Sequence, residues 1–392
     1  MVRESEAVLA PRKNTRGLIL EVIRTRGPIS RVELAEATGL TAATMTNVVR
    51  RLLADRLVIE AGHGESTGGK RRVLLEVDPG ARFAVGIQLG IESTVMVVSN
   101  LWGAVVGRAR TAGPAGGSPK DFLDRLAASL SDLVESLGMD RSLIVGVGIA
   151  AAGPFDRGRG AFASSTNFSQ WAGYPLREEF AERTGLGVVL ENEATAAAVG
   201  EFWSGAVGDV NSFAMIHMET EIGVGIVSQG RPVRGATGNA GGLGHVSVDL
   251  RGEQCRCGNR GCLEAIAAPQ AALRRYGAST DRWMNSSKLS AAVVAGDPEA
   301  LRALEPSVTA FGSIAVSLTN LLDLDRIVLT GAGFGNAISF FISGIQRALD
   351  ERSLVTGMSR VSVQASVNVR DAAAVGAAAI VLHDEVEGFN PV

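Results

Sequence analysis

The sequence lacks the features that mark membrane and secreted proteins. Apolar runs such as residues 143–152 are far shorter than the roughly 20 residues needed to span a bilayer, and the amino-terminal residues lack the apolar core of a signal peptide. Cysteine is scarce, and all three cysteines lie within residues 255–262, a clustering that favours metal binding over a framework of disulfides. We therefore expect a globular, cytoplasmic protein without membrane contacts, whose 46% hydrophobic content can build large cores.

Low-complexity tracts and short solenoid repeats are also missing, and neither sign of charge dominates. The net charge is −3, yet residues 1–80 hold 13 Lys and Arg against 10 Asp and Glu, whereas the remainder holds 25 against 31. This modest split suits a weakly basic nucleic-acid module joined to an acidic ligand-binding body, but it does not establish one alone.

Three short helices are predicted near the amino terminus. The apolar face of the first ends at Gly27-Pro28 and consists of Leu18, Ile19, Val22 and Ile23. Ser30 and Glu33 have the spacing of a capping box that starts the second helix, and Gly39 makes the next turn. Thr41 caps the third helix, whose apolar stripe is Met45, Val48, Val49, Leu52 and Leu53.

The opposite face of this third helix, residues 41–54, carries small or hydrogen-bonding side chains. They are Ala42, Ala43, Thr46, Asn47 and Arg50. A helix buried on one side and furnished in this way on the other can enter a DNA major groove. We therefore predict that these five residues face the bases or the DNA backbone.

A basic wing is predicted after the third helix. Strands at 57–60 and 72–77 flank the glycine-rich segment 62–69, which leads into Lys70, Arg71 and Arg72. We expect these cations to reach phosphates or the adjacent minor groove. The pattern predicts a winged helix-turn-helix over residues 1–79, with a boundary at Asp78-Pro79-Gly80; a plain helical bundle with a charged surface hairpin is the alternative.

From residue 83 the pattern becomes α/β. It predicts strands at 83–89, 95–99, 104–110 and 143–149 with a helix at 119–136, and then a similar order with strands at 212–217, 224–228 and 326–330 and a helix at 306–322. An Ala-rich helix at 371–383 closes the chain. Two such halves imply two lobes with a cleft between them, the first at about 80–198 plus the carboxy-terminal segment 371–392, the second at about 199–370.

One histidine and the three cysteines form the sharpest motif. Gly244-His245 is followed by Cys255-Arg-Cys257-Gly-Asn-Arg-Gly-Cys262-Leu-Glu264. These residues can close a tetrahedral site, which predicts one structural Zn²⁺ bound by His245, Cys255, Cys257 and Cys262. Three reduced cysteines in an ordinary loop are the alternative.

This motif resembles the signature of the ROK family of repressors, open reading frames and sugar kinases. The resemblance implies an actin-like, sugar-kinase fold for about residues 80–392, and the added winged helix-turn-helix at 1–79 is the arrangement of the repressor branch. It further implies a homodimer or dimer of dimers on a pseudo-palindromic double-stranded DNA operator, and a small carbohydrate or sugar derivative as effector.

The phosphate-binding motifs of the kinases are altered. Where the kinases have Asp-x-Gly-x-Thr, this chain has Gln88-Leu-Gly90-Ile-Glu92, and a second glycine-rich turn contains Glu221. The lost carboxylate and the added acids argue against ATP. The third loop, 331–335, keeps its glycines, which backbone shape alone can explain.

The kinase base is an Asp at the start of a helix, and the matching position here is Glu193, after Asn192. Glutamate displaces the carboxylate by a bond length, and a shift of roughly 1 Å can cost 100-fold in a positioned reaction, so we predict no catalysis. Glu193 can still accept a hydrogen bond from a sugar hydroxyl. The alternative role of this pair is helix capping.

The family resemblance adds further sugar contacts. With the pair above, the predicted ligand-binding set is Asn167, Asn192, Glu193, His245 and Glu264. Gly242 breaks the pattern, because the family commonly has Glu at this position. An altered sugar, a larger ligand or a lost site would each explain this change.

These observations favour a sugar-responsive DNA-binding repressor that is not an enzyme. An active ATP-dependent sugar kinase with a regulatory DNA-binding domain is the second hypothesis, and a ligand-independent DNA-binding or scaffold protein is the third. The sequences of the phosphate loops favour the repressor hypothesis over the kinase hypothesis, since Gln88, Glu92 and Glu221 all oppose nucleotide binding.

Overall fold

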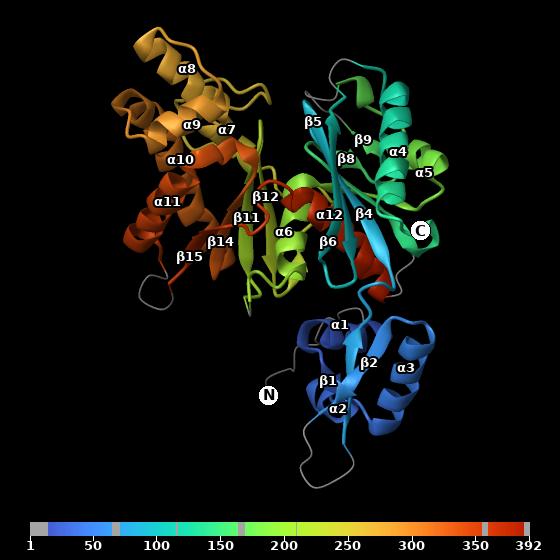
Figure 1. Ribbon diagram of the computed structural model, residues 1–392. Helices are drawn as coiled ribbons and strands as arrows, with labels where there is room; N and C mark the ends of the chain where they lie inside the picture. Colours follow the sequence, from blue (N-terminus) through green and yellow to red (C-terminus); the bar gives the residue numbers. More distant parts are fainter. Residues whose placement is uncertain are drawn as a thin grey trace, which may run out of the picture.

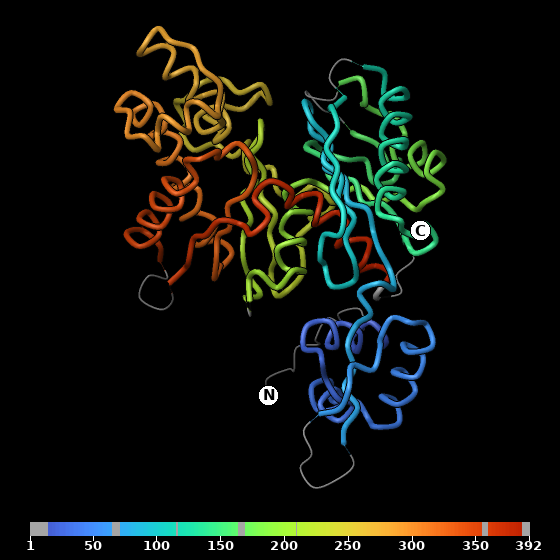
Figure 2. Tube along the Cα trace, viewed as in Figure 1, coloured from blue at the N-terminus to red at the C-terminus, as the bar shows by residue number. Residues whose placement is uncertain are grey.

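The computed structural model describes residues 15–64, 71–114, 117–163, 169–208, 210–354 and 360–387. Two lobes, each built on a five-stranded sheet, lie above a small amino-terminal domain, and the carboxy-terminal helix passes between the lobes (Figures 1 and 2). None of the helices in the described part of the chain combines the length and the hydropathy of a membrane-spanning segment.

The amino-terminal domain combines three helices with a small antiparallel sheet of order β1-β3-β2. Its elements are α1 (Thr15–Arg26), β1 (Ile29–Ser30), α2 (Arg31–Thr38), α3 (Ala42–Ala54), β2 (Val58–His63) and β3 (Val73–Val77). Ser30 and Glu33 form both bonds of the capping box, and Gly39 ends α2 with φ of 67°. The Thr41 hydroxyl accepts a hydrogen bond from the Thr44 N–H at 3.3 Å, as predicted for the cap of α3.

The first lobe is built on a sheet of order β10-β7-β4-β5-β6. The strands of this sheet are β4 (Phe83–Leu89), β5 (Ser93–Asn100), β6 (Val105–Ala112), β7 (Ile144–Ala151) and β10 (Val188–Asn192). The lobe also contains a separate hairpin of β8 (Phe155–Asp156) and β9 (Ala161–Phe162), and two 3₁₀ turns, Arg141–Leu143 and Ser169–Trp171. Antiparallel pairing joins β4, β5 and β6, whereas β7 and β10 run parallel to β4. One face of the sheet packs on α4 (Pro119–Ser136) and α5 (Leu176–Thr184).

The second lobe repeats the strand order of the first sheet. Its sheet has the order β13-β12-β11-β14-β15 and comprises β11 (Phe213–Met218), β12 (Ile222–Ser228), β13 (Arg231–Pro232), β14 (Arg326–Thr330) and β15 (Ser362–Ala365). Its remaining elements are η3 (Leu243–His245), α7 (Leu263–Ala267), α8 (Pro269–Thr280), α9 (Ser286–Val294), α10 (Pro298–Leu322), η4 (Ala332–Ala337) and α11 (Ile338–Arg352). The predicted start of α10 near Pro306 was wrong, because Asp297 caps the helix and Pro306 lies inside it.

Two helices lie back to back between the sheets. They are α6 (Glu193–Trp203) and α12 (Ala372–Glu387). Of the two, α12 packs on the first sheet (Figure 1). A Cβ on Gly376 would lie 1.6 Å from the Ala196 carbonyl oxygen, so only glycine permits this close approach. The helices thus join the lobes through a tightly packed core.

Candidate functional site

The exposed face of α3 is the candidate DNA interface. All five predicted residues, Ala42, Ala43, Thr46, Asn47 and Arg50, are exposed, whereas Met45, Val49 and Leu52 are buried. The Thr46 hydroxyl donates to the Ala42 carbonyl oxygen at 2.8 Å, and Arg50 donates to Asn47 Oδ1 at 3.4 Å. These contacts hold the polar side chains along the face and leave the Asn47 amide hydrogens available for a base edge.

The wing is formed by β2 and β3. Arg71 and Arg72 are exposed immediately before β3, where they can meet phosphates. Lys70 lies outside the described residues, as does the predicted sugar contact Asn167.

His245, Cys255, Cys257 and Cys262 come together as the motif predicts. Their potential ligand atoms all lie within 4.8 Å of one another. Cys257 Sγ is 3.7 Å from Cys262 Sγ, and Cys255 Sγ is 3.7 Å from His245 Nδ1. A tetrahedral zinc site with Zn–S distances near 2.3 Å needs sulfurs about 3.8 Å apart, so the cluster has the dimensions to hold this ion. Burial raises the pKa of the Cys262 thiol to about 12, so a cation must displace a proton to bind this sulfur.

Asn192 and Glu193 lie where the first lobe meets α6. The Asn192 side-chain oxygen accepts hydrogen bonds from the Ala194 N–H at 2.9 Å and the Thr195 N–H at 3.4 Å, so this residue does cap the helix. The cap uses the amide oxygen, and Nδ2 is the group that can donate to a ligand.

The buried Glu193 carboxylate lies 3.5 Å from His217 Nδ1, on β11 of the second lobe. Burial alone would lower the pKa of His217, but the Glu193 and Glu219 carboxylates outweigh that effect and raise it. Glu193, at the start of α6, therefore lies against His217 of the second lobe. The sequence analysis did not single out His217. The signal that could have identified it is a polar residue at the end of a largely apolar predicted strand, residues 212–217.

Glu264 is buried and both of its oxygens accept hydrogen bonds. Oε2 accepts from the Ile222 N–H at 3.2 Å, and Oε1 accepts from Arg256 at 3.0 Å. Arg256 also pairs with Glu221 at 2.7 Å. Burial and the nearby Glu264 carboxylate raise the pKa of Glu221. Arg256, which lies between Cys255 and Cys257, thus links the cysteine loop to Glu221 and Glu264, and the sequence analysis did not single it out.

An acidic side chain contacts the glycine loop at residues 331–335. Glu219, between β11 and β12, accepts a hydrogen bond from the Ala332 N–H at 3.0 Å, in the glycine loop that begins at Gly331. This carboxylate occupies a backbone donor of the kind that holds phosphate oxygens. Gln88 is buried at the end of β4, and Glu92 is exposed in the turn that follows.

Other polar contacts cross between the lobes near Asn192. Asn239 of the second lobe exchanges two hydrogen bonds with the Phe155 backbone, at 2.8 and 3.0 Å. The buried Glu191 carboxylate pairs with Arg157 of the first lobe and, at 2.8 Å, with Arg234 of the second. A Cβ on Gly242 would meet nothing within 4 Å, so the missing family glutamate leaves open space.

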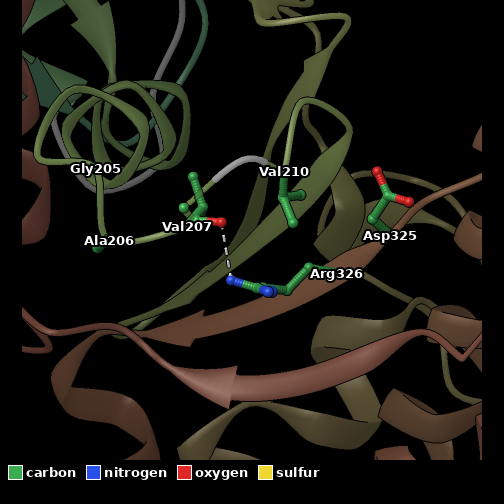
Figure 3. A pocket seen from close by; sticks show the side chains of 7 residues that line it. Gly205, Ala206, Val207, Val210, Asp325 and Arg326 are labelled. Atoms are coloured by element: carbon green, nitrogen blue, oxygen red, sulfur yellow. Dashed lines mark hydrogen bonds between the residues drawn. The ribbon is translucent and has the colours of Figure 1, made fainter. Parts of the chain in front are cut away.

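Two surface hollows lie away from these residues. One, of about 590 Å³, lies beside the end of α6, and its lining includes Val207 and Arg326, whose guanidinium donates to the Val207 carbonyl at 3.1 Å (Figure 3). Another, of about 690 Å³, lies between α10 and α11. Neither is lined by a predicted ligand residue.

A model described as ROK family matches residues 84–384, which is well over half of the chain. The chain belongs to the ROK family. Within that family, the predicted repressor arrangement is confirmed by a second model, described as winged helix-turn-helix DNA-binding, that matches residues 12–59.

The similar proteins include both repressors and sugar kinases. The chain is 30% identical over 384 residues to a putative xylose repressor of Caldicellulosiruptor sp. (strain Rt8B.4), covering 94% of this chain and 95% of that protein. It is 32% identical over 249 residues to the glucokinase of Thermotoga maritima, covering 60% of this chain and 78% of that enzyme.

The predicted fold class is also confirmed. A solved structure described as a ROK family transcriptional regulator, a homologue of the Escherichia coli MLC protein, matches with a TM-score of 0.82. It has 24% sequence identity, and the match covers 96% of this chain and 97% of that one. At this identity the match shows the shared fold of a winged helix-turn-helix joined to a ROK body.

Proposed function

We propose that this protein is a transcriptional repressor that binds operator DNA through α3 and the wing and is regulated by a sugar that it does not phosphorylate. The xylose repressors among its relatives make D-xylose the first sugar to test. The observation that carries the proposal is an asymmetry of the cleft. Its sugar side keeps Asn192, Glu193 and Glu264, while Glu219 occupies the glycine loop of the phosphate side.

Catalysis is opposed by charge as well as by geometry. Phosphoryl transfer requires that the phosphates be held and neutralised. Here Glu219 and Glu221 face that side, and the nearby cation Arg256 is already paired with the carboxylates of Glu221 and Glu264. ATP would therefore lose a backbone donor and meet added negative charge.

The proposed metal is one structural Zn²⁺ on His245, Cys255, Cys257 and Cys262. Zinc would supply cross-linking of the loop and no chemistry on the sugar, since four protein ligands leave it no open position. The loop positions Arg256, and through Arg256 it orients Glu264 in the cleft. Further sugar contacts from Asn167 and His245 belong to the same proposal.

The test uses the purified chain and DNA from the region upstream of its own gene. Fluorescence anisotropy measures DNA affinity with and without D-xylose, D-glucose or N-acetylglucosamine, and a coupled assay follows ATP consumption. We expect specific DNA binding, weakened or strengthened by one of these sugars, and no ATP turnover. Sugar-dependent ATP consumption with a phosphorylated product would support the kinase hypothesis and contradict the proposal.

A further inference from the structure

Helix α6 connects the cleft to the DNA-binding domain. It begins at Glu193, whose carboxylate faces His217 of the second lobe, and ends at Trp203. Its 11 residues span roughly 16 Å at 1.5 Å per residue. A single rigid element therefore has one end among the proposed sugar contacts and the other at the base of the body.

At its lower end, α6 is held by Arg24 of helix α1. The Arg24 guanidinium stacks on the Trp203 ring, 4.0 Å from the ring centroid, and donates to the Trp203 carbonyl oxygen at 2.7 Å. Two hydrogen bonds to Glu21, at 2.8 and 2.9 Å, fix its orientation. Because the last carbonyls of a helix have no partner within it and carry partial negative charge, this contact stabilises the end of α6.

The contact is buried and tightly packed. The Arg24 side chain is 8% exposed although it is charged, and Trp203 is 5% exposed. The ring of His383, on α12, meets the indole edge-on with centroids 5.5 Å apart. Ile19, Leu20 and Ile23 of α1 belong to the same apolar core as Trp203 and Val375. The DNA-binding domain is thus packed directly against the ends of α6 and α12.

Movement of α6 cannot be absorbed locally. A Cβ on Gly200 would lie 2.8 Å from the Gly376 Cα, and a Cβ on Gly225 of β12 would lie 2.1 Å from the Ala194 carbonyl oxygen. The helix is therefore pressed against backbone on both sides, and close-packed interfaces of this kind shift between discrete arrangements.

We propose that α6 is the coupling element of the repressor, and that Arg24 and Trp203 are the positioning residues that pass a sugar-dependent shift at Glu193 to the winged helix. The inference rests on the proposed function and specifies its route. A sugar hydroxyl that bonds Glu193 competes with His217 and changes which packing of α6 is favoured. A shift of α6 then reorients α1 and, with it, α3.

The test is the variant Arg24→Met, which keeps a long apolar stem but removes the stacked cation and the bond to the Trp203 carbonyl. DNA affinity is measured with and without the sugar that regulates the wild type, D-xylose first. A typical coupling changes affinity by about 5- to 150-fold, and we expect Arg24→Met to reduce the ratio to less than about twofold. Sugar affinity in the absence of DNA should remain that of the wild type.

The matched control is Arg26→Met, the same substitution on an exposed arginine of the same helix, which should keep the full ratio. Where Arg24→Met fails to fold, Arg24→Lys keeps the charge but loses the planar stack, and its ratio should be intermediate. A wild-type ratio in either folded Arg24 variant overturns the inference. A wild type whose DNA affinity no sugar changes instead overturns the proposed function, so the two failures are distinguishable.

Discussion

At the scale of single residues, the proposed site has residues that can meet sugar hydroxyls, and it has Glu219 on the glycine loop that holds phosphate in the kinases. Asn192 shows why one residue can serve both structure and ligand. Its oxygen caps α6, while its Nδ2 group is left to donate to the proposed sugar. Helix capping and sugar binding, alternatives in the sequence, are therefore compatible.

Asn192→Asp separates these two roles. The aspartate keeps the capping oxygen and removes the amide donor, so we expect the free energy of unfolding to change little while the effector response is lost. Asn192→Ala removes both and should also cost about 1 kcal/mol of stability. Calorimetry with the sugar and a thermal melt measure the two effects. The control is Asn285→Asp, which changes the N-cap of the distant helix α9 in the same way.

Glu264→Ala should likewise abolish the sugar response while ligand-free DNA binding remains nearly intact. The change removes a buried carboxylate and leaves Arg256 with Glu221 alone. Anisotropy titrations with and without sugar measure both quantities. A Glu264→Ala protein with a normal response would exclude this residue from the sugar site.

Charge on the phosphate side predicts selectivity against anionic sugars. Glu193, Glu219 and Glu221 would lie near a phosphate carried by the effector, so D-xylose 5-phosphate should bind more weakly than D-xylose. In the double variant Glu219→Gln, Glu221→Gln, the ratio of the Kd for D-xylose 5-phosphate to the Kd for D-xylose should fall by about tenfold. This change corresponds to about 1.4 kcal/mol of relieved repulsion. Competition calorimetry measures it, and tighter binding of the phosphate by the wild type would refute the charge argument.

At the scale of elements, we assign separate roles to the cysteine loop, residues 255–262, and to helix α3. The loop that carries the proposed zinc site positions Arg256, which pairs with Glu264. Cys257→Ser should therefore release the metal and weaken the sugar response through a misplaced loop, whereas DNA binding without sugar should persist. Metal analysis of freshly purified, reduced protein measures zinc directly, with one ion expected per chain. A wild type without zinc would contradict the assignment.

Helix α3 and the wing should contribute differently to DNA binding. Asn47→Ala should lower discrimination between operator and random DNA by about 1–3 kcal/mol, because it removes hydrogen bonds to a base edge. Replacing Lys70, Arg71 and Arg72 with Ala should weaken binding to all sequences and reduce the salt slope by roughly 0.9 for each phosphate that the wing no longer neutralises. Unchanged affinity in both variants would exclude this surface from the DNA interface.

At the scale of the whole molecule, the two lobes and the DNA-binding domain share packed cores. We propose a homodimer or dimer of dimers that reads a pseudo-palindrome, since two-fold protein symmetry matches two-fold operator symmetry. Footprinting should show two half-sites about 10 base pairs, or a multiple of this, apart. Sedimentation of the chain with a single half-site and with a complete operator would separate this arrangement from binding by one protomer.

The sequence by itself determined the local features of this protein. Short spacings predicted the caps at Ser30 and Thr41, the exposed face of α3 and the cysteine cluster, because capping, periodicity and metal ligation act between neighbours in the chain. The start of α10 was misplaced because proline is read as a helix boundary, although it can lie inside a long helix whose other contacts are satisfied.

Only the tertiary structure decided the contacts that complete the site. Glu193 meets His217, Glu219 reaches Ala332 across 113 positions, and Arg24 reaches Trp203 across 179. No periodicity or spacing encodes such pairs, since each depends on how two separately formed units pack together. The proposed sugar contacts could be named from residue types, but the contact between the DNA-binding domain and the lobes exists only because burial brings α1 onto the ends of α6 and α12.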